Sequence, residues 1–142
     1  MKIVFDLDNT LVDSFGASLR PGIEPLLSRL RAEGHTLVLW TSSRRERALD
    51  ILRLHGLRRH FATCICREDY DPEEKNVPKD IRAIQGDILI DDDPQAIDYA
   101  RSTGRKAILI RPYQKGQKAD PKEVAALYAH IRRATGFWGQ TR

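Results

Sequence analysis

The chain has 142 residues, of which 41% are hydrophobic and 31% carry a charged side chain, and its formal net charge is +4 at pH 7. This size and hydrophobic content fit one domain with one well-formed core, residues 1–142, and no linker or shift in composition indicates a second. No apolar run approaches the roughly 20 residues of a membrane span and no signal-peptide pattern is present, so we expect a cytoplasmic protein without a membrane partner.

The first predicted element is the apolar run Lys2–Phe5, which is typical of a strand buried on both faces of a parallel sheet. It leads into two carboxylates one residue apart, Asp6 and Asp8, followed by Asn9 and Thr10. In open α/β sheets, ligands bind beyond the carboxyl ends of the strands, so these four side chains fall where a reacting group would bind. The same residue types are common in turns and helix caps, so a polar turn is the alternative.

The next segments predict a turn, a helix and a second strand. Residues 11–20 contain Gly16 and predict a small flap over the site, too short for a lid domain. Apolar residues at helical spacing predict a helix over Pro21–Glu33, and Thr36–Trp40 is typical of a buried strand. That strand ends in three hydroxyl side chains: Thr41, Ser42 and Ser43.

A further helix is predicted to run from Ser43 to about His55. Ser43 followed by Glu46 fits a capping box, which assigns Ser43 to the helix cap and leaves Thr41 for the site. This also explains part of the hydroxyl cluster without any function.

Three arginines fall in the first turn of that helix, at the mouth of the predicted pocket: Arg44, Arg45 and Arg47. The helix dipole and the guanidinium groups would both favour an anion there. Arginines in a first helical turn are also ordinary surface residues, so substrate contact and solvated surface both stay open.

Phe61–Cys66 is typical of a third strand. Its two cysteines, Cys64 and Cys66, fall far short of a zinc site, and we expect them to be reduced structural residues. Residues 67–77 predict an acidic loop, folded as a small hairpin.

Pro78 predicts a helix start that places Lys79 in the first turn, at the end of the sheet that carries the aspartates. Taken alone, Lys79 would be a surface lysine. Lys75 is the rival, and the spacing to the next strand favours Lys79.

A second apolar run, Asp87 to Ile90, leads into three carboxylates: Asp91, Asp92 and Asp93. A strand rises ~3.3 Å per residue, so Asp87 lies roughly 13 Å from Asp91, at the wrong end of the strand. Asp93 before Pro94 fits an N-cap followed by proline at the first helical position. Asp91 and Asp92 remain for the site.

The C-terminal part predicts a fifth strand at Arg105–Ile110 and a helix capped at Asp120. Residues 101–142 hold ten Lys or Arg and two acidic residues, a balance that fits either a nucleic-acid partner or solvated surface. The closing pair Phe137 and Trp138 predicts a packing anchor for the tail.

The run Asp6-Leu7-Asp8-Asn9-Thr10-Leu11 resembles the first motif of the haloacid dehalogenase superfamily of phosphohydrolases. The resemblance implies that Asp6 attacks phosphorus, while Asp8 gives a proton to the leaving oxygen and later takes one from water. Dehalogenases of the superfamily lack a second aspartate there, so Asp8 favours phosphoryl transfer.

The other superfamily motifs follow in order. By resemblance, Thr41 hydrogen-bonds the transferring phosphoryl group, Lys79 holds the nucleophile and the phosphoryl oxygens, and Asp91 with Asp92 forms the fourth motif. A weaker likeness, through Arg20-Pro21-Gly22 among other stretches, links the chain to the capless branch that includes the RNA polymerase II C-terminal-domain phosphatases.

These carboxylates and a phosphate dianion would repel one another unless a cation were present. An all-oxygen ligand set is what Mg²⁺ prefers, and no His or Cys nearby would recruit zinc. The resemblance implies ligation by Asp6, the backbone carbonyl of Asp8, and Asp91, with Asp92 orienting bound water.

Strands alternating with helices predict a doubly wound, Rossmann-like α/β fold with a parallel sheet of about five strands and no large cap domain. We therefore expect an Mg²⁺-dependent phosphatase that hydrolyses a phosphomonoester through an aspartyl-phosphate, on a large or exposed substrate such as a phosphoprotein or nucleic-acid end. The alternatives are an idle phosphate-recognising module and a small-metabolite or nucleotide phosphatase. The candidate substrate-binding residues are Asn9, Thr10, Ser42, Arg44 and Arg45.

Overall fold

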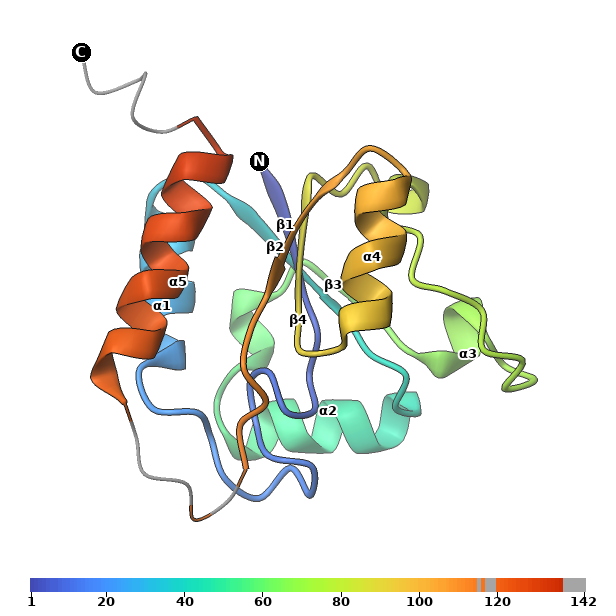
Figure 1. The fold of residues 1–142 in the computed structure, drawn as a ribbon. Helices are drawn as coiled ribbons and strands as arrows, with labels where there is room; N and C mark the ends of the chain where they lie inside the picture. Colours follow the sequence, from blue (N-terminus) through green and yellow to red (C-terminus); the bar gives the residue numbers. More distant parts are fainter. Residues whose placement is uncertain (115, 117–119, 137–142) are drawn as a thin grey trace.

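The computed structural model describes residues 1–114, 116 and 120–136 of the chain. Its centre is a five-stranded sheet in the order β3-β2-β1-β4-β5, and every neighbouring pair is parallel (Figure 1). The predicted fold class is confirmed. The strands are β1 (Lys2–Phe5), β2 (Thr36–Trp40), β3 (Thr63–Ile65), β4 (Ile88–Asp91) and β5 (Lys106–Leu109).

Helices cover both faces of this sheet. Figure 1 shows α1 and α5 side by side on the left and α4 on the right, with the strands between them. Two short 3-10 helices connect elements, η1 (Arg58–His60) and η2 (Ile81–Ile84). The α-helices are α1 (Ile23–Ala32), α2 (Arg45–Leu54), α3 (Arg67–Tyr70), α4 (Pro94–Ser102) and α5 (Pro121–Ala134). None of the described helices is long and apolar enough to cross a membrane.

The apolar run of β1 fills two cores because successive side chains of a strand point to opposite faces. Ile3 and Phe5 pack in the larger core with side chains of α1, α2 and α5, whereas Val4 packs with side chains of α4 and η2. All three are fully buried, which explains why β1 is apolar after Lys2. Each strand β1, β2 and β4 is covered in this way on both sides.

The order of the strands determines where a site can form. From β1 the chain moves outward to β2 and β3, and then returns to place β4 on the other side of β1. Phe5 pairs with Leu39 of β2 and with Ile90 of β4. Residues that follow these strands therefore meet at one edge, at the topological switch point where ligands bind in such sheets.

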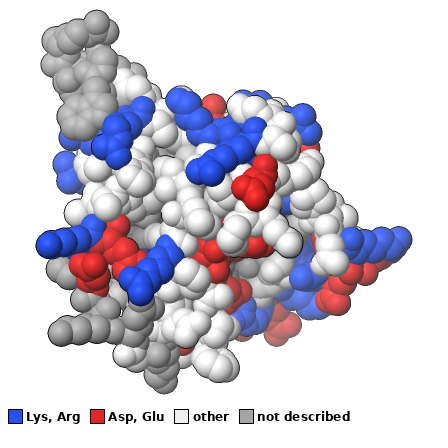
Figure 2. Space-filling model, in the orientation of Figure 1, with Lys and Arg blue, Asp and Glu red and all other residues white. Residues whose placement is uncertain are grey.

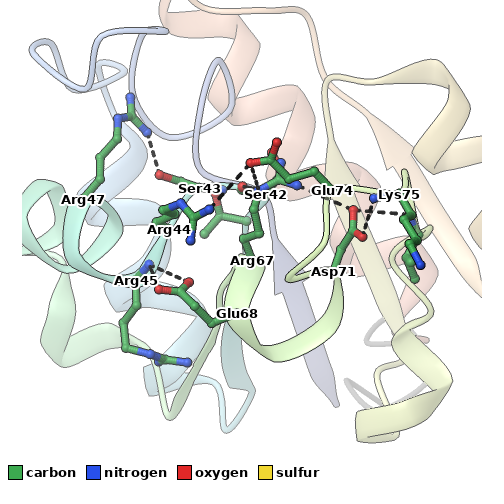
Figure 3. A network of polar contacts seen from close by, with 12 residues as sticks. Ser42, Ser43, Arg44, Arg45, Arg47, Arg67, Glu68, Asp71, Glu74 and Lys75 are labelled. Carbon is green, nitrogen blue, oxygen red and sulfur yellow. Dashed lines mark hydrogen bonds and ion pairs between the residues drawn. The ribbon is translucent and has the colours of Figure 1, made fainter.

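The predicted cap of α2 is wrong. The helix begins at Arg45 and its N-cap residue is Arg44, without a side-chain hydrogen bond. Instead the carboxylate of Glu68 accepts the backbone N–H of Arg45, with N–O distances of 2.9 and 3.2 Å (Figure 3). A carboxylate from a distant segment thus satisfies an N–H of the first helical turn, in place of the cap that we expected from the Ser43 side chain.

Residues 67–77, which we call the α3 segment, do not form the predicted hairpin. They begin with α3 and continue in turns that Asp71 holds, because its carboxylate accepts the N–H groups of Lys75 and Val77. The predicted helix start at Pro78 is also wrong. Lys79 precedes a 3-10 helix that Asp80 caps by accepting the N–H of Arg82.

The segment 11–20 packs on α2 instead of covering the site, so the predicted flap is wrong. His55 contacts the carbonyl of Gly16 at 2.8 Å, and a Cβ at Gly16 would come within 2.4 Å of Ile51. Gly16 has φ 71°, where glycine is least strained. This contact keeps the segment away from the pocket described below, which none of residues 11–20 lines.

The caps predicted at Asp93 and Asp120 are confirmed, because their carboxylates accept the N–H groups of Gln95 and Lys122. Asp87 is also placed as predicted. It lies before β4 and accepts the N–H of Lys2, away from the site. The proposed anchor, Phe137 and Trp138, lies outside the described residues.

Candidate active site

A pocket of about 590 Å³ opens at the carboxyl edge of the sheet. Side chains that follow β1, β2 and β4 meet in its wall, as the strand order requires. The predicted site residues among those that line it are Asp6, Asp8, Asn9, Ser42, Lys79, Asp91 and Asp92.

Asp6 is held through both carboxylate oxygens. Lys79 Nζ lies 2.8 Å from Oδ1, and the Thr10 hydroxyl donates to Oδ2 at 3.0 Å. The same ammonium contacts Asp91 Oδ2 at 2.9 Å, so Lys79 bridges the ends of β1 and β4. Lys75, the rival, pairs with Glu73 on the surface.

Burial governs the electrostatics of this group. It raises the pKa of Asp6 and of Asp91, and Lys79 opposes the rise in both. Burial also disfavours the charged Lys79, but Asp6 and Asp91 outweigh that effect and raise its pKa above the ordinary value. The pKa of Asp92 is raised as well, mainly by burial. Such a concentration of carboxylates in a low-dielectric site favours a bound cation.

Three of the carboxylates form a group that fits a metal ion. Oxygen atoms of Asp6, Asp91 and Asp92 all lie within 4.8 Å of one another. An all-oxygen donor set with no nitrogen or sulfur suits Mg²⁺. The Asp8 carboxylate lies outside this group, whereas the resemblance assigned Asp8 a ligand role through its backbone carbonyl.

The hydroxyls after β2 differ in their placement. Thr41 is buried, and its Oγ1 accepts the backbone N–H of Ser43 at 3.0 Å. Ser42 lines the pocket. Asn9 also lines the pocket; it has a left-handed backbone with φ 64°, and its Oδ1 is buried without a hydrogen-bond partner. That conformation turns the chain sharply after β1 and is one that asparagine tolerates.

The predicted rim arginines are all paired with carboxylates. Arg44 lies 3.8 Å from Glu74 (Figure 3), and Arg45 contacts Asp69, so the pairing joins the start of α2 to the α3 segment. Neither arginine lines the pocket. Figure 2 likewise shows blue and red atoms interleaved on the right, where the α3 segment lies, instead of one basic field.

The α3 segment provides a wall of the pocket that the sequence analysis missed. Its lining residues include Arg67, Tyr70, Asn76 and Val77. Arg67 is tied to the end of β2, because its Nε donates to the Ser42 carbonyl at 2.7 Å and its backbone N–H to the Ser43 carbonyl at 3.0 Å. The many acidic residues indicated a solvated loop, and no local pattern signals these long-range contacts.

Arg20 also has a structural role that was not predicted from the sequence. It is 3% exposed, and its guanidinium donates to the carbonyls of Asn9, Thr10 and Arg111 and to the Glu123 carboxylate. One buried side chain thus joins the loop after β1 to the segment after β5 and to the start of α5. We assign Arg20 to positioning of that loop.

Replacing Arg20 by Met should lower the free energy of unfolding by about 3 kcal/mol, because several buried carbonyls lose their donor and Glu123 loses its partner. Urea unfolding followed by circular dichroism measures this change. Arg53→Met, at an exposed ion pair 3.8 Å long, is the control and should change stability by less than about 0.5 kcal/mol. Equal stability of the Arg20 and Arg53 variants would contradict this role.

A five-stranded parallel sheet with two aspartates after β1 and a bridging lysine between β1 and β4 defines a phosphohydrolase domain of the haloacid dehalogenase superfamily. The family model of the NLI interacting factor-like phosphatases matches residues 1–135. The chain belongs to this family.

Comparison with curated proteins finds a relative assigned as the pyrophosphatase PpaX of Caldanaerobacter subterraneus subsp. tengcongensis. It is 28% identical over 114 residues, which cover 72% of this chain and 52% of the relative. The chain therefore spans about half the length of this curated relative.

Solved structures share the fold. A hydrolase from Streptococcus pneumoniae TIGR4 is 13% identical, with a TM-score of 0.63 over 78% of this chain and 92% of that chain. A chain of the Pnkp1/Rnl/Hen1 complex is 18% identical, with a TM-score of 0.61 over 80% of this chain and 47% of that chain. At these identities the likeness concerns the fold alone.

Proposed function

We propose that this protein is an Mg²⁺-dependent phosphatase that hydrolyses a phosphomonoester through an aspartyl-phosphate on Asp6. The observation that carries the proposal is the placement of Asp6, at the topological switch point, with one oxygen on Lys79 and the other on Thr10. A carboxylate fixed through both oxygens presents its lone pairs in one orientation, which favours in-line attack.

In the first step an oxygen of Asp6 attacks phosphorus, and the bond between phosphorus and the leaving oxygen breaks. Asp8, which lines the same pocket, gives a proton to that oxygen. The ammonium of Lys79 stays beside Asp6 and faces the negative oxygens of the phosphoryl group. Positioning and charge stabilisation together lower the barrier.

In the second step water attacks the phosphorus of aspartyl-phosphate, and the bond between phosphorus and the Asp6 oxygen breaks. Asp8 takes the proton of this water, which returns it to its acid form for the next substrate. Inorganic phosphate then leaves.

Asp6, Asp91 and Asp92 would hold the metal ion, with the backbone carbonyl of Asp8 as a further ligand in our proposal. The ion would supply charge neutralisation for the phosphate and orient it. We expect 4-nitrophenyl phosphate hydrolysis to require Mg²⁺ and to stop with EDTA, while Ca²⁺ restores less than about a tenth of the rate, because its larger, looser coordination misplaces the substrate. Full activity in EDTA would contradict metal dependence, and lack of turnover with Mg²⁺ would favour a phosphate-binding module.

The substrate that we propose is a phosphate on a protein. No segment in the described part of the chain forms a lid domain over the pocket, and an open pocket can admit a phosphate attached to something large. The rim arginines Arg44 and Arg45, which would attract nucleic acid, are engaged by carboxylates. We expect kcat/KM for a phosphoserine peptide to exceed that for a sugar phosphate and for a 5′-phosphorylated oligonucleotide by at least about tenfold. A sugar phosphate or an oligonucleotide as the best substrate would overturn this assignment and leave the phosphatase activity standing.

A further inference from the structure

The guanidinium of Arg47 hydrogen-bonds to both carboxylate oxygens of Asp8. Its Nη1 lies 3.0 Å from Asp8 Oδ2 and its Nη2 lies 2.9 Å from Asp8 Oδ1, so the guanidinium and the carboxylate face each other through two hydrogen bonds. Both groups are partly exposed, 41% for the Arg47 side chain and 29% for that of Asp8. An ion pair this exposed contributes little to the stability of the fold. Its two-pronged geometry, however, fixes the orientation of the Asp8 carboxylate.

The guanidinium is itself held in place by two other contacts. Nη1 donates to the Ser43 hydroxyl at 3.0 Å, and Nη2 donates to the Ser14 carbonyl at 3.1 Å. Figure 3 shows Arg47 extending from α2, with its contact to Ser43 drawn as a dashed line. Arg47 therefore joins α2, the end of β2 and the segment after β1, and the plane of its guanidinium is fixed from three sides.

The other arginines of the α2 start do not act on the pocket in this way. Arg44 and Arg45 pair with Glu74 and Asp69 of the α3 segment, none of which lines the pocket. Asp8 does line the pocket and is the proton donor of the proposed reaction. The contact of Arg47 is thus the one in this group that reaches a reacting side chain.

We infer that Arg47 is a positioning residue for Asp8. Its two-pronged contact holds the ionised carboxylate beside the pocket, and when Asp8 carries its proton, one oxygen stays on the guanidinium while the O–H on the other faces the leaving oxygen. This inference rests on the proposed function. Proton transfer depends steeply on the position of the donor, because reacting atoms must lie within hydrogen-bond reach and in line. A lysine cannot substitute, since it offers one point charge where arginine offers a planar fork.

A positioning role of Arg47 differs from a general structural role in how the rate depends on the leaving group. A nitrophenolate leaves without needing a proton, whereas a benzyl alkoxide needs one as its bond to phosphorus breaks. Misplacing Asp8 should therefore slow benzyl phosphate far more than 4-nitrophenyl phosphate. The two substrates share the later hydrolysis of aspartyl-phosphate, and kcat/KM reports only the step that expels the leaving group.

The experiment compares kcat/KM for the two esters in the wild-type protein, Arg47→Gln, Arg47→Lys and the control Arg53→Gln, which alters an exposed pair on the same helix. We expect the ratio of benzyl to nitrophenyl kcat/KM to fall at least about tenfold in both Arg47 variants and to stay unchanged in the control. Loss of folded protein cancels in this ratio. If Arg47→Gln does not fold, Arg47→Lys gives the same comparison.

A double-mutant cycle with Asp8→Asn sharpens the result. Asp8→Asn should lower the ratio by itself, and adding Arg47→Gln should lower it no further, because Arg47 acts through Asp8. Equal losses of kcat/KM on both esters, which leave the ratio unchanged, would overturn the inference. A further fall of the ratio in the double variant would overturn it as well. A wild-type protein that hydrolyses neither ester with Mg²⁺ would overturn the phosphatase proposal and this inference with it.

Discussion

Replacing Asp6 by Asn should lower kcat by at least about 10⁴-fold and leave the fold intact. The change removes the nucleophile and a metal-binding oxygen, whereas the amide keeps the shape of the side chain. One contact of Lys79 persists, because its ammonium also lies 2.9 Å from Asp91. Hydrolysis of 4-nitrophenyl phosphate at saturating Mg²⁺ measures the loss.

Asp87→Asn is the matched control for that variant. Asp87 is an aspartate beside the same sheet, but it lies before β4 and accepts the N–H of Lys2 at 2.8 Å. Its substitution should leave kcat within about twofold, since it is far from the pocket. Substantial activity in Asp6→Asn, or comparable losses in the two variants, would remove the basis for assigning chemistry to Asp6.

Replacing Lys79 by Met should lower kcat by about 10²–10³-fold and destabilise the metal-free protein by about 3 kcal/mol. The Lys79 ammonium compensates two carboxylates whose side chains are only 10% and 2% exposed, those of Asp6 and Asp91. Without it, these buried charges repel each other in a low-dielectric site. Adding Mg²⁺ should restore part of the stability, because the carboxylates can then bind the cation.

The stability of the metal-free Lys79→Met protein should also depend on pH. Burial already raises the pKa of Asp6 and of Asp91, and removal of Lys79 raises both further. A carboxyl group whose pKa is raised by folding favours the folded state at low pH, and this stabilisation is lost as the pH rises through the folded-state pKa. Unfolding midpoints between pH 5 and 8 measure this trend. Lys75→Met, at an exposed pair, should show no comparable change.

The parts of the fold that could be predicted from the sequence are those with local signals. The buried strands appear in the sequence as short apolar runs. Asp93 before Pro94 supplies both an N-cap and a proline at the first helical position. The adjacency of Asp6 and Asp91 followed from two such runs that each end in carboxylates, together with the rule that parallel strands share a carboxyl edge.

The remaining parts depend on contacts between segments distant in the sequence. Glu68 caps α2 across 23 residues, and Arg20 reaches Glu123 across 103. The α3 segment looked like a polar loop because its acidic residues carry no hydrophobic period, although two of them pair with the arginines at the start of α2, Arg44 and Arg45. Arg47 looked like a candidate anion ligand, whereas the structure pairs it with Asp8. Composition signals the charges, but only the fold selects their partners.

The most direct test of covalent catalysis by Asp6 is to identify the phosphorylated residue during turnover. The protein is mixed with substrate and Mg²⁺, quenched in acid within milliseconds and treated with borohydride, which reduces an acyl phosphate and so converts the modified aspartate to homoserine. Mass spectrometry of the peptides then locates the change. We expect homoserine at position 6 in the wild-type protein and at no position in Asp6→Asn. Reduction at another residue would contradict covalent catalysis by Asp6. An unmodified Asp6 would also contradict it if a rapid initial burst of product shows that a covalent intermediate accumulates.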